Sequence, residues 1–564
     1  MRTARRRRRR LGGPRARLAG LLLLVVVVVV AAIEALSGSG GIQGRPFESM
    51  FQDDQMLVDN PSTPSVIQTL DTLKALGVDR LRVTVQWKQV APNANVRLMP
   101  RGFNGADPAD YPQTAASGWA AYDRIDLLAA EKGIAVDFDV SDPAPLWATT
   151  NYPPADVSPA VYAPSAREFG QFVEAVGRRY SGHYKIVVTP GKPKVALPRV
   201  SFWTIWNEPN QPGWLAPQFR VTGAGAATML SPALDREYVD AAWTALHASG
   251  HGKDRILIGE LAPEGCPPGG GNAVCGVYTR AERPITPIPF LQALYCVNGS
   301  YQRLTSAAAS AVGCPPSGSA AAFRAGNPAL FDASAFTHHP YAFATAPAVP
   351  LPEPSFVPLS NLVRLETALD HAFAAYGSQR KIPLYLDEYG YETNPPNPIP
   401  GRGQSLRHQA AWIDQAEYMA WKDPRVEGLS QFLLVDAAPD PTFPKGSQGY
   451  WSTFQTGLEF LGGQPKPSLA AYRLPIFLPS TSGGGPVLVW GMLRPARNGT
   501  TQHAAIQWRA PGRRFHTVTE ITTSNRDGVF ETPVSVPRRG AIRIGWTAPG
   551  GRRYYSRAAS VSKG

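Results

Sequence analysis

The alternation of strand-like and helix-like segments between residues 48 and 480 constrains the fold more than any other feature. Apolar runs such as DRLRVTVQW, IAVDFDVSD and IPLYLDEYG alternate with amphipathic stretches such as NLVRLETALDHAFAAYG. In residues 64–76 the apolar side chains recur with the helical period, and Gly77 follows as a helix stop. Eight such units predict a closed (β/α)8 TIM barrel over residues 48–480. An open doubly wound sheet is the rival, but no Gly-rich phosphate-binding turn follows an early strand.

Residues 486–564 show a different pattern. Short runs such as PVLVWGML, HAAIQW and AIRIGW are separated by turn residues, and the helical period disappears. This spacing predicts a small C-terminal β-sandwich. The unit is basic, and its predicted turns carry adjacent arginines: Arg513, Arg514, Arg538, Arg539, Arg552 and Arg553. We expect it to dock on an anionic cell-envelope or membrane surface; a solvated face that only aids solubility is the other interpretation.

The net charge of +13 is unevenly distributed along the chain. Residues 1–17 hold nine arginines and no acidic residue, and residues 485–564 hold 13 lysines and arginines against 3 acidic residues. The part between them is mildly acidic. A basic balance confined to the two ends does not indicate nucleic-acid binding, so we expect no nucleic-acid partner.

The arginine-rich start precedes an unbroken apolar run from Leu18 to Ile33, which is typical of an export signal. As a helix this run would span about 24 Å, which is shorter than the roughly 30 Å hydrocarbon layer of a bilayer. A cleaved signal peptide is favoured, and an uncleaved anchor stays open because no strict Ala-x-Ala site follows. Residues 1–47 are therefore expected to be a signal or anchor plus a flexible tether, with the rest extracellular or at the cell surface.

The four cysteines lie in one stretch of 49 residues, at Cys266, Cys275, Cys296 and Cys314. An exported protein keeps disulfides oxidised, so we expect two of them, with nearest-neighbour pairing favoured among three connectivities. A zinc site is the rival, but the spacings lack a CxxC motif and no histidine lies nearby.

The ends of the predicted strands carry the residues suited to chemistry, because reactive groups of a TIM barrel lie at the carboxyl ends of its strands. In chain order they are Arg82, Trp87, Asp139, Asp142, Trp147, Asn207, Glu208, Glu260, His338, His339, Tyr341, Asp387, Glu388, Tyr389 and Tyr391. Pro209 ends strand pairing after Glu208 because proline has no N–H to donate, which leaves that carboxylate on the rim.

Several of these motifs together resemble clan A retaining glycoside hydrolases, a group that includes cellulases, mannanases and β-xylosidases. WNEP at residues 206–209 resembles the clan's acid/base motif at the end of the fourth strand. LYLDEYG at 384–390 resembles its nucleophile strand, HHPY at 338–341 its sixth-strand motif, and LGVDRLRVTVQWKQVAP at 76–92 its second-strand region. The resemblance covers about residues 48–478.

The resemblance implies an exported glycosidase that hydrolyses O-glycosidic bonds of a poly- or oligosaccharide with retention. Glu208 would be the general acid/base and Glu388 the nucleophile, with their carboxyl groups about 5–5.5 Å apart. Asn207 would hydrogen-bond the substrate's 2-hydroxyl, Arg82 would keep Glu388 ionised, and Tyr341 would donate to the nucleophile. No metal or cofactor is expected, and we expect a monomer.

Neighbouring residues at the strand ends cannot share one face, because side chains alternate along a strand. We therefore expect His339 to contact the substrate while His338 is structural, and Asp387 to point away from Glu388. Glu260 is expected to line the cleft or to support a neighbouring side chain.

Aromatic side chains suit the faces of sugars, so Trp87, Trp147 and Trp451 are expected to contact the substrate, with Trp206 and Trp214 as further candidates. Many clan members end the eighth strand with a tryptophan, whereas this strand reads LSQFLLVDAA; Trp451 is the expected substitute. A non-catalytic glycan-binding protein on the same scaffold and a cell-envelope interaction protein are the functional alternatives. The sugar and the linkage stay open.

Overall fold

The computed structural model describes residues 47–562 except 115–116, 150–152, 155–156, 190, 224–226, 268–274, 481–485, 497–498 and 538. The predicted export segment and tether lie, apart from Phe47, outside the described residues. In the part of the chain that is described, none of the helices is both long and apolar enough to cross a bilayer.

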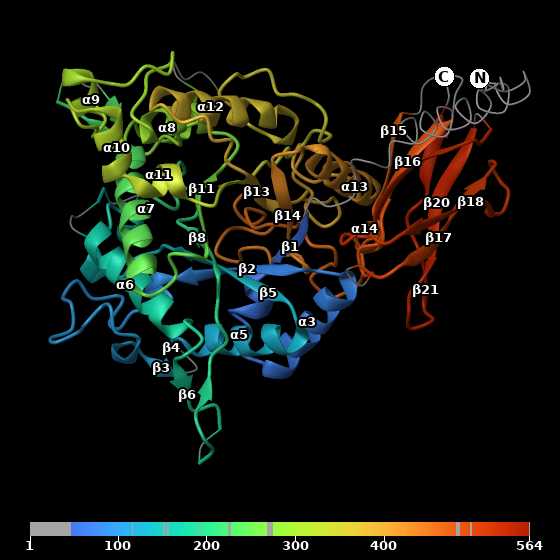
Figure 1. Cartoon of the computed structure of the whole chain (residues 1–564), viewed down its shortest axis with the longest axis horizontal. Coiled ribbons are helices and arrows are strands. Elements are labelled where there is room, and N and C mark those ends of the chain that lie inside the picture. Colours follow the sequence, from blue (N-terminus) through green and yellow to red (C-terminus); the bar gives the residue numbers. More distant parts are fainter. Residues whose placement is uncertain are drawn as a thin grey trace, which may run out of the picture.

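Eight parallel strands form a closed barrel, as the alternation predicts (Figure 1). Their order around the barrel is β1-β14-β13-β12-β11-β8-β5-β2, so neighbours in sequence are neighbours in space. The strands are β1 (Glu48–Gln52), β2 (Arg80–Gln86), β5 (Ala135–Ser141), β8 (Phe202–Ile205), β11 (Arg255–Leu261), β12 (Ala335–His338), β13 (Leu384–Tyr389) and β14 (Val426–Phe432).

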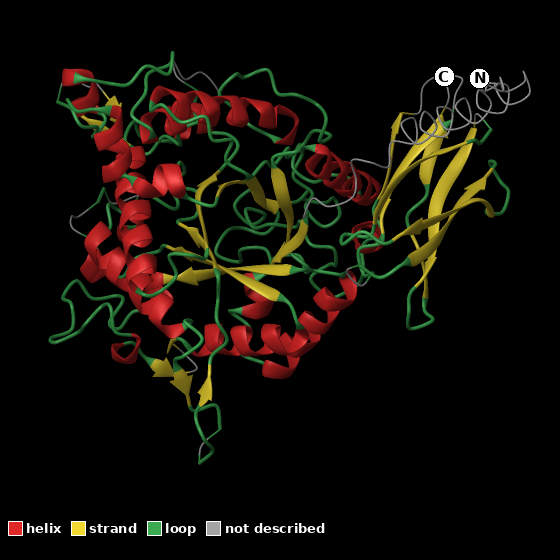
Figure 2. Cartoon of the chain, viewed as in Figure 1, coloured by secondary structure: helices red, strands yellow, loops and turns green. Residues whose placement is uncertain are grey.

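Helices surround the barrel strands (Figure 2). The long ones are α3 (Thr63–Leu76), α5 (Ala120–Lys132), α6 (Ala166–Arg179), α7 (Ser231–Ala248), α12 (Leu362–Ala375) and α13 (Leu406–Lys422). In α3, the Ser62 hydroxyl caps the first turn by accepting from the Ser65 N–H. Gly77 ends the helix in the left-handed region at φ 87°, where the sequence predicts the stop.

Smaller elements fill the connections. They are α2 (Asp54–Leu57), α4 (Trp87–Val90) and α14 (Pro467–Arg473), with the two-stranded ribbons β3 (Gln113–Thr114) and β4 (Ser117–Gly118), β6 (Lys185–Ile186) and β7 (Val195–Ala196), and β9 (Phe219–Val221) and β10 (Ala227–Met229). The longest connection runs from β11 to β12 and contains α8 (Pro287–Leu294), α9 (Ser306–Ala311), α10 (Ala320–Gly326) and α11 (Pro328–Asp332).

The cysteines of this long connection pair as nearest neighbours, which confirms the prediction. Cys266 is bonded to Cys275, with 5.6 Å between the Cα atoms, and Cys296 to Cys314, with 5.8 Å. The first disulfide follows β11 directly, and the second lies among the short helices, beside the buried Ala309.

The C-terminal unit consists of two antiparallel sheets, as predicted. One sheet contains β15 (Ile476–Ser480), β16 (Val487–Met492) and β19 (Val529–Val534); the other contains β17 (Gln502–Arg509), β18 (His516–Thr523), β20 (Arg539–Thr547), β21 (Arg553–Tyr555) and β22 (Ala559–Ser562). The predicted domain boundary is wrong by one strand. Residues 476–480, assigned to the barrel from the sequence, pair with β16 and belong to the sandwich.

The sandwich packs on helix α13 of the barrel. Trp490 of β16 is fully buried and its ring lies 5.6 Å from that of Tyr418 and 5.8 Å from that of Trp421. Arg494 forms a buried ion pair with Glu417 at 2.9 Å. The two units therefore share one continuous interior surface.

Candidate active site

A cavity of about 480 Å³ opens at the carboxyl ends of the barrel strands. The predicted site residues Asn207, Glu208, Tyr341 and Glu388 line it. Further lining residues come from the start and the end of the barrel: Gln52, Asp54, Thr84, Gln86, Phe432 and Phe454. The structure thus brings together, on one rim, side chains that are far apart in the sequence, from Gln52 to Phe454.

The backbone after β8 explains how Glu208 reaches the rim. Trp206 and Glu208 adopt left-handed backbone conformations, with φ of 64° and 39°, which residues other than glycine rarely adopt. Trp206 is fully buried and stacks on Tyr238 at 4.2 Å, and the Glu208 N–H donates to the Glu260 carbonyl at 3.1 Å. These contacts hold the strained turn, in addition to the proline that the sequence pattern emphasised.

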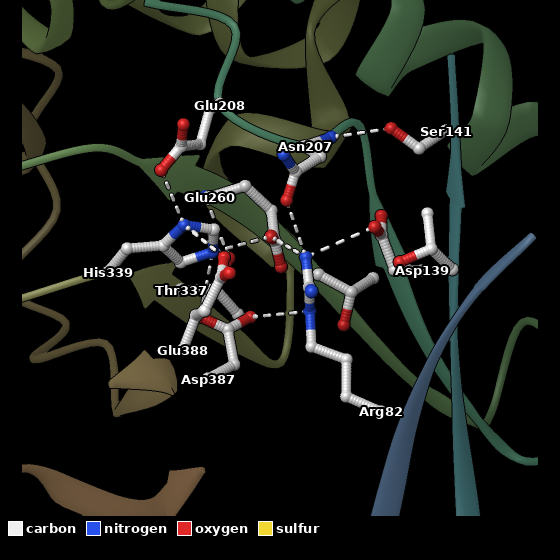
Figure 3. Close-up of polar contacts among 12 residues, drawn as sticks. Arg82, Asp139, Ser141, Asn207, Glu208, Glu260, Thr337, His339, Asp387 and Glu388 are labelled. Carbon is white, nitrogen blue, oxygen red and sulfur yellow. Dashed lines mark hydrogen bonds and ion pairs between the residues drawn. The ribbon is translucent and has the colours of Figure 1, made fainter. Parts of the chain in front are cut away.

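Arg82 lies at the centre of the buried polar network beneath the rim (Figure 3). It contacts Glu260 in a close ion pair, Asp139 at 3.1 Å and Asp387 at 3.8 Å, and donates to the Asn207 Oδ1 at 2.8 Å. The sequence predicts a role for Arg82 in keeping Glu388 ionised. Arg82 forms its ion pairs with other carboxylates. It therefore lowers the pKa of Glu388 by longer-range electrostatic attraction and not through a direct ion pair.

His339 bridges the acidic side chains (Figure 3). Its Nδ1 lies 2.9 Å from a carboxylate oxygen of Glu208 and 2.9 Å from one of Glu388, and its Nε2 lies 2.9 Å from Glu260. Burial lowers the pKa of His339, but the charge of Glu388 and hydrogen bonds to the carboxylates outweigh it and raise the pKa well above 6.5. His339 is therefore an imidazolium that can donate from both ring nitrogens.

His338 has a structural environment. Its Nε2 lies 2.7 Å from the Val357 carbonyl, and burial lowers its pKa to about 4. His338 is thus neutral and faces the barrel wall, while His339 faces the site. This is the division that strand alternation predicts.

Glu208 and Glu388 lie close together with opposite pKa shifts. Their carboxylate oxygens that face His339 lie within 4.8 Å of each other. Burial raises the pKa of Glu208 above 4.5, although His339 opposes that shift. Burial also raises the pKa of Glu388, but the charge and hydrogen bond of His339 and the charge of Arg82 together lower it below 4.5. Relative to a free glutamate, the site therefore stabilises the acid form of Glu208 and the ionised form of Glu388.

Asp387 corrects the expectation that it points away from Glu388. The pairing of β13 with β14 shifts register between Leu386 and Tyr389, so strict alternation is broken there. Asp387 consequently contacts Arg82 at 3.8 Å and His339 at 3.6 Å, inside the barrel.

The sequence leaves two roles open for Glu260: lining the cleft or supporting a neighbouring side chain. β11 shifts register between Ile258 and Leu261, and Glu260 adopts φ 50°. Its carboxylate is fully buried between Arg82 and His339, which lower its pKa despite burial. Glu260 is not among the lining residues of the cavity, so it supports the site from beneath.

Two of the candidate tryptophans, Trp87 and Trp147, pack in the core, whereas Trp214 lines the cavity. Trp87 is fully buried and stacks on Phe172 at 5.8 Å. Trp147 packs edge-on against Trp87 at 5.9 Å, and its Nε1 donates to the Pro92 carbonyl. Trp147 is partly exposed, but neither ring is among the described residues that line the cavity.

Trp451 does not replace the missing eighth-strand tryptophan. Its ring packs against Tyr450, and Trp451 is absent from the described lining of the cavity. Aromatic rings of that lining come from Trp214, Tyr278, Tyr341, Phe343, Phe432 and Phe454. Phe432 ends β14, and its ring meets that of Phe454 edge-on at 5.3 Å. Phe432 belongs to the apolar run LSQFLLVD. In the sequence alone it cannot be told apart from an ordinary strand residue.

Tyr341 lies beside Glu388, close enough for its hydroxyl to interact with that carboxylate. Its hydroxyl is buried and makes no hydrogen bond of regular geometry with a described residue. Burial, and next the charge of Glu388, raise the pKa of Tyr341 well above 10. The ring stacks on Tyr389 at 6.2 Å and on Phe343 at 5.7 Å, which fixes its position.

Two groups of side chains have a spacing that could hold a metal ion: Glu208, His339 and Glu388, and Glu260, His339 and Asp387. Both depend on His339. A protonated imidazole has no lone pair for a metal, and the Arg82 guanidinium adds a second positive charge beside the deeper group. These side chains therefore fit a compensated carboxylate cluster better than a metal centre.

The comparisons with known proteins find similarity at the level of structure. No family model and no curated protein matches the sequence. Among solved structures, a glucosidase from Croceicoccus marinus matches with a TM-score of 0.44 and 11% identity over 88% of this chain and 95% of that one.

Two further matches are a family 39 glycoside hydrolase and a family 39 β-xylosidase. The first, from Bacteroides cellulosilyticus WH2, has a TM-score of 0.42 and 12% identity over 87% of this chain and 79% of that one. The second, from Caulobacter crescentus, has a TM-score of 0.41 and 13% identity over 83% and 84%. Because these TM-scores lie below 0.5, function is inferred below from the side chains of this chain.

Proposed function

We propose that this protein is a retaining glycoside hydrolase. The observation that carries the proposal is the pair Glu208 and Glu388, whose oxygens lie within 4.8 Å and whose pKa values shift in opposite directions. Retaining hydrolysis uses carboxyl groups about 5–5.5 Å apart, whereas inversion needs about 6.5–9.5 Å to admit a water molecule. The short spacing supports retention.

In the first step, the ionised Glu388 attacks the anomeric carbon and forms a glycosyl ester, while the bond to the leaving oxygen breaks. Glu208 gives its proton to that oxygen, so the leaving group departs as a neutral alcohol. In the second step, the Glu208 carboxylate takes a proton from water. The resulting hydroxide attacks the same carbon and displaces Glu388, which restores both side chains.

Asn207 is suited to bind the substrate next to the reacting carbon. Its Oδ1 accepts from Arg82 at 2.8 Å, and its backbone N–H donates to the Ser141 hydroxyl at 2.8 Å. The first contact fixes the side-chain oxygen and the second fixes the backbone, so the side-chain Nδ2 is the group left to donate to a sugar hydroxyl in the cavity. We assign Asn207 to the 2-hydroxyl.

We further propose that the enzyme is exported and acts on a poly- or oligosaccharide at or beyond the cell surface. The arginine-rich start, the apolar run and two disulfides support export. The aromatic rings of the cavity support a carbohydrate, because sugar faces pack on such rings.

The stereochemical outcome tests the proposed reaction. A screen of aryl glycosides would identify a substrate, and proton NMR of the first product would identify its anomer. We expect the product to have the configuration of the substrate. A first product of inverted configuration would contradict the retaining mechanism.

A further inference from the structure

The outer face of the five-stranded sheet carries a row of arginines and aromatic rings. In β17 and β20, Trp508 and Ile542 point into the sandwich core, so Arg509 and Arg543 point outward. Figure 1 shows β18 and β20 on the side of the sandwich away from the barrel. The face is therefore not used in the contact with the barrel.

The side chains on this face form a stacked row in which guanidinium groups and rings alternate. Arg509 lies 4.6 Å and Arg543 4.1 Å from the centre of the Phe515 ring. Arg543 lies 3.9 Å and Arg553 5.4 Å from the centre of the Tyr555 ring. Cation–π contacts at these distances hold the guanidinium planes in place.

Gln507 adds a hydrogen bond, since its Oε1 accepts from the Arg543 Nε at 2.8 Å. Arg543 is thus fixed from three sides: by two rings and by an amide. Its outer N–H groups stay available to a ligand.

The row holds positive charge without a protein counter-charge. Among the described residues, no carboxylate lies within ion-pair distance of Arg509, Arg543 or Arg553. Burial first, and then the neighbouring charges of Arg509 and Arg553, lower the pKa of Arg543. Three like charges held side by side repel one another, and a bound anion removes that repulsion.

We propose that this arginine–aromatic row, made of Arg509, Phe515, Arg543, Arg553 and Tyr555, binds a polysaccharide that carries carboxylates. A planar guanidinium with fixed orientation pairs with a carboxylate through two parallel hydrogen bonds. Several such groups in a row fit a polymer with repeated carboxylates. This surface is separate from the proposed catalytic cavity and does not depend on the proposed reaction.

The chemistry of the row distinguishes this ligand from other polyanions. Single-stranded nucleic acid needs free ring faces on which bases stack, whereas here guanidinium groups occupy faces of Phe515 and Tyr555. A lipid surface needs protruding apolar groups, and Tyr555 is the single exposed large hydrophobic side chain among the described residues of this sheet.

Binding of the full chain to polygalacturonate tests the proposal, with neutral dextran as the reference polymer. We expect the double variant Arg509→Gln, Arg543→Gln to bind about tenfold more weakly, the effect of losing about 1.4 kcal/mol. The matched control is Arg101→Gln, Arg167→Gln, which removes two exposed barrel arginines and should bind as the wild type. Thermal melting of each variant checks that it folds.

The single variant Arg543→Lys separates a built site from general charge attraction. Lysine keeps the charge but loses the planar stack and the paired hydrogen bonds, so we expect weaker binding than the wild type. Wild-type binding by Arg543→Lys, or equal losses in the two double variants, would overturn the proposal. Binding of polyuridylate or anionic vesicles as tight as that of polygalacturonate, with the same dependence on Arg543, would also overturn it.

Discussion

At the residue scale, His339 connects the proposed acid, the proposed nucleophile and the buried Glu260 through two ring nitrogens. Its positive charge lowers the pKa of both Glu208 and Glu388. Overall, the pKa of Glu208 is raised and the pKa of Glu388 is lowered. Activity should therefore require a pH between these two pKa values. His339 therefore sets the position of the pH profile without reacting itself.

Replacement of His339 by Asn should move the whole profile of kcat/KM to higher pH. The nucleophile must be ionised, and without the imidazolium the pKa of Glu388 rises, so the acid limb moves up. The acid must be protonated, and the pKa of Glu208 also rises, so the basic limb moves in the same direction. The matched control is His338→Asn, which should leave both limbs in place; an unshifted profile for His339→Asn would contradict this account.

Replacement of Glu208 by Ala should separate substrates by their leaving groups. An activated aryl group leaves without protonation, whereas an alkyl or sugar leaving group needs the acid. We expect the loss in kcat/KM to be about 10²-fold larger for unactivated than for activated substrates. The measurement is a leaving-group series for wild type and variant, and equal losses along the series would count against Glu208 as the acid.

At the element scale, irregular strand ends decide what reaches the site. The register shifts in β11 and β13 turn Glu260 and Asp387 toward Arg82, and the left-handed turn after β8 presents Glu208. Strand order, helix positions and the two glutamates could be predicted from sequence, because they follow hydrophobic periodicity and position along each strand. The orientation of Asp387 could not, because alternation assumes an unbroken pleat.

Gly259 is the residue whose backbone allows the irregular end of β11. Its φ is 125°, and an added Cβ would lie 2.6 Å from both the Phe336 ring and the Thr337 carbonyl oxygen. We expect Gly259→Ala to lower the free energy of unfolding by about 2–4 kcal/mol and to reduce activity by displacing Glu260. In the matched control Gly299→Ala, an added Cβ meets no atom within 4 Å, so melting should be unchanged. Equal stability of the two variants in thermal denaturation would refute this.

The disulfide that follows β11 should affect the site more than the second disulfide. Cys266 and Cys275 line the cavity, whereas Cys296 and Cys314 lie among the short helices outside it. We expect Cys266→Ser, Cys275→Ser to lower kcat/KM severalfold more than Cys296→Ser, Cys314→Ser. Kinetics of the two double variants measure this, and a larger effect of the second pair would show that the first disulfide does not shape the cavity.

At the scale of the whole molecule, the barrel and the sandwich stabilise each other. Gly77 at the end of α3 approaches the sandwich so closely that an added Cβ would lie 2.2 Å from the Arg494 carbonyl oxygen. Arg557 of the C-terminal segment pairs with the buried Asp414 of α13. The β-sandwich could be predicted from the sequence, but its packing against the barrel could not. The spacing of apolar residues does not show which outer face of a sheet another domain covers.

Loss of Arg494 should destabilise both units together. Its ion pair with Glu417 is almost fully buried, so Arg494→Ala leaves an uncompensated charge, at a cost of about 3–5 kcal/mol. The double variant Arg494→Met, Glu417→Leu should recover most of this loss. Differential scanning calorimetry is expected to show one transition at a lower Tm for the single variant; a second transition, with the barrel unaffected, would mean that the units fold independently.

The contact between the sandwich and the barrel limits which variants can test the C-terminal unit. Deletion of residues 486–564 would leave β15 without its partner strand and would expose the packing surface of Trp421. Of the arginines in the predicted turns of the C-terminal unit, Arg513, Arg514, Arg539, Arg552 and Arg553 are exposed, and Arg538 lies outside the described residues. Point variants of the intact chain are therefore the better test of surface binding.

Covalent trapping tests the central claim, that Glu388 is the nucleophile of a retaining glycosidase, most directly. A 2-deoxy-2-fluoro aryl glycoside of the sugar found in the screen should form a stable ester, because fluorine slows the second step more than the activated first step. Intact-mass and peptide mass spectrometry should show one added sugar per chain, located on Glu388, and none on Glu388→Ala. A label on Glu260 or Glu208, or turnover with no label under conditions that inactivate the enzyme, would contradict the account.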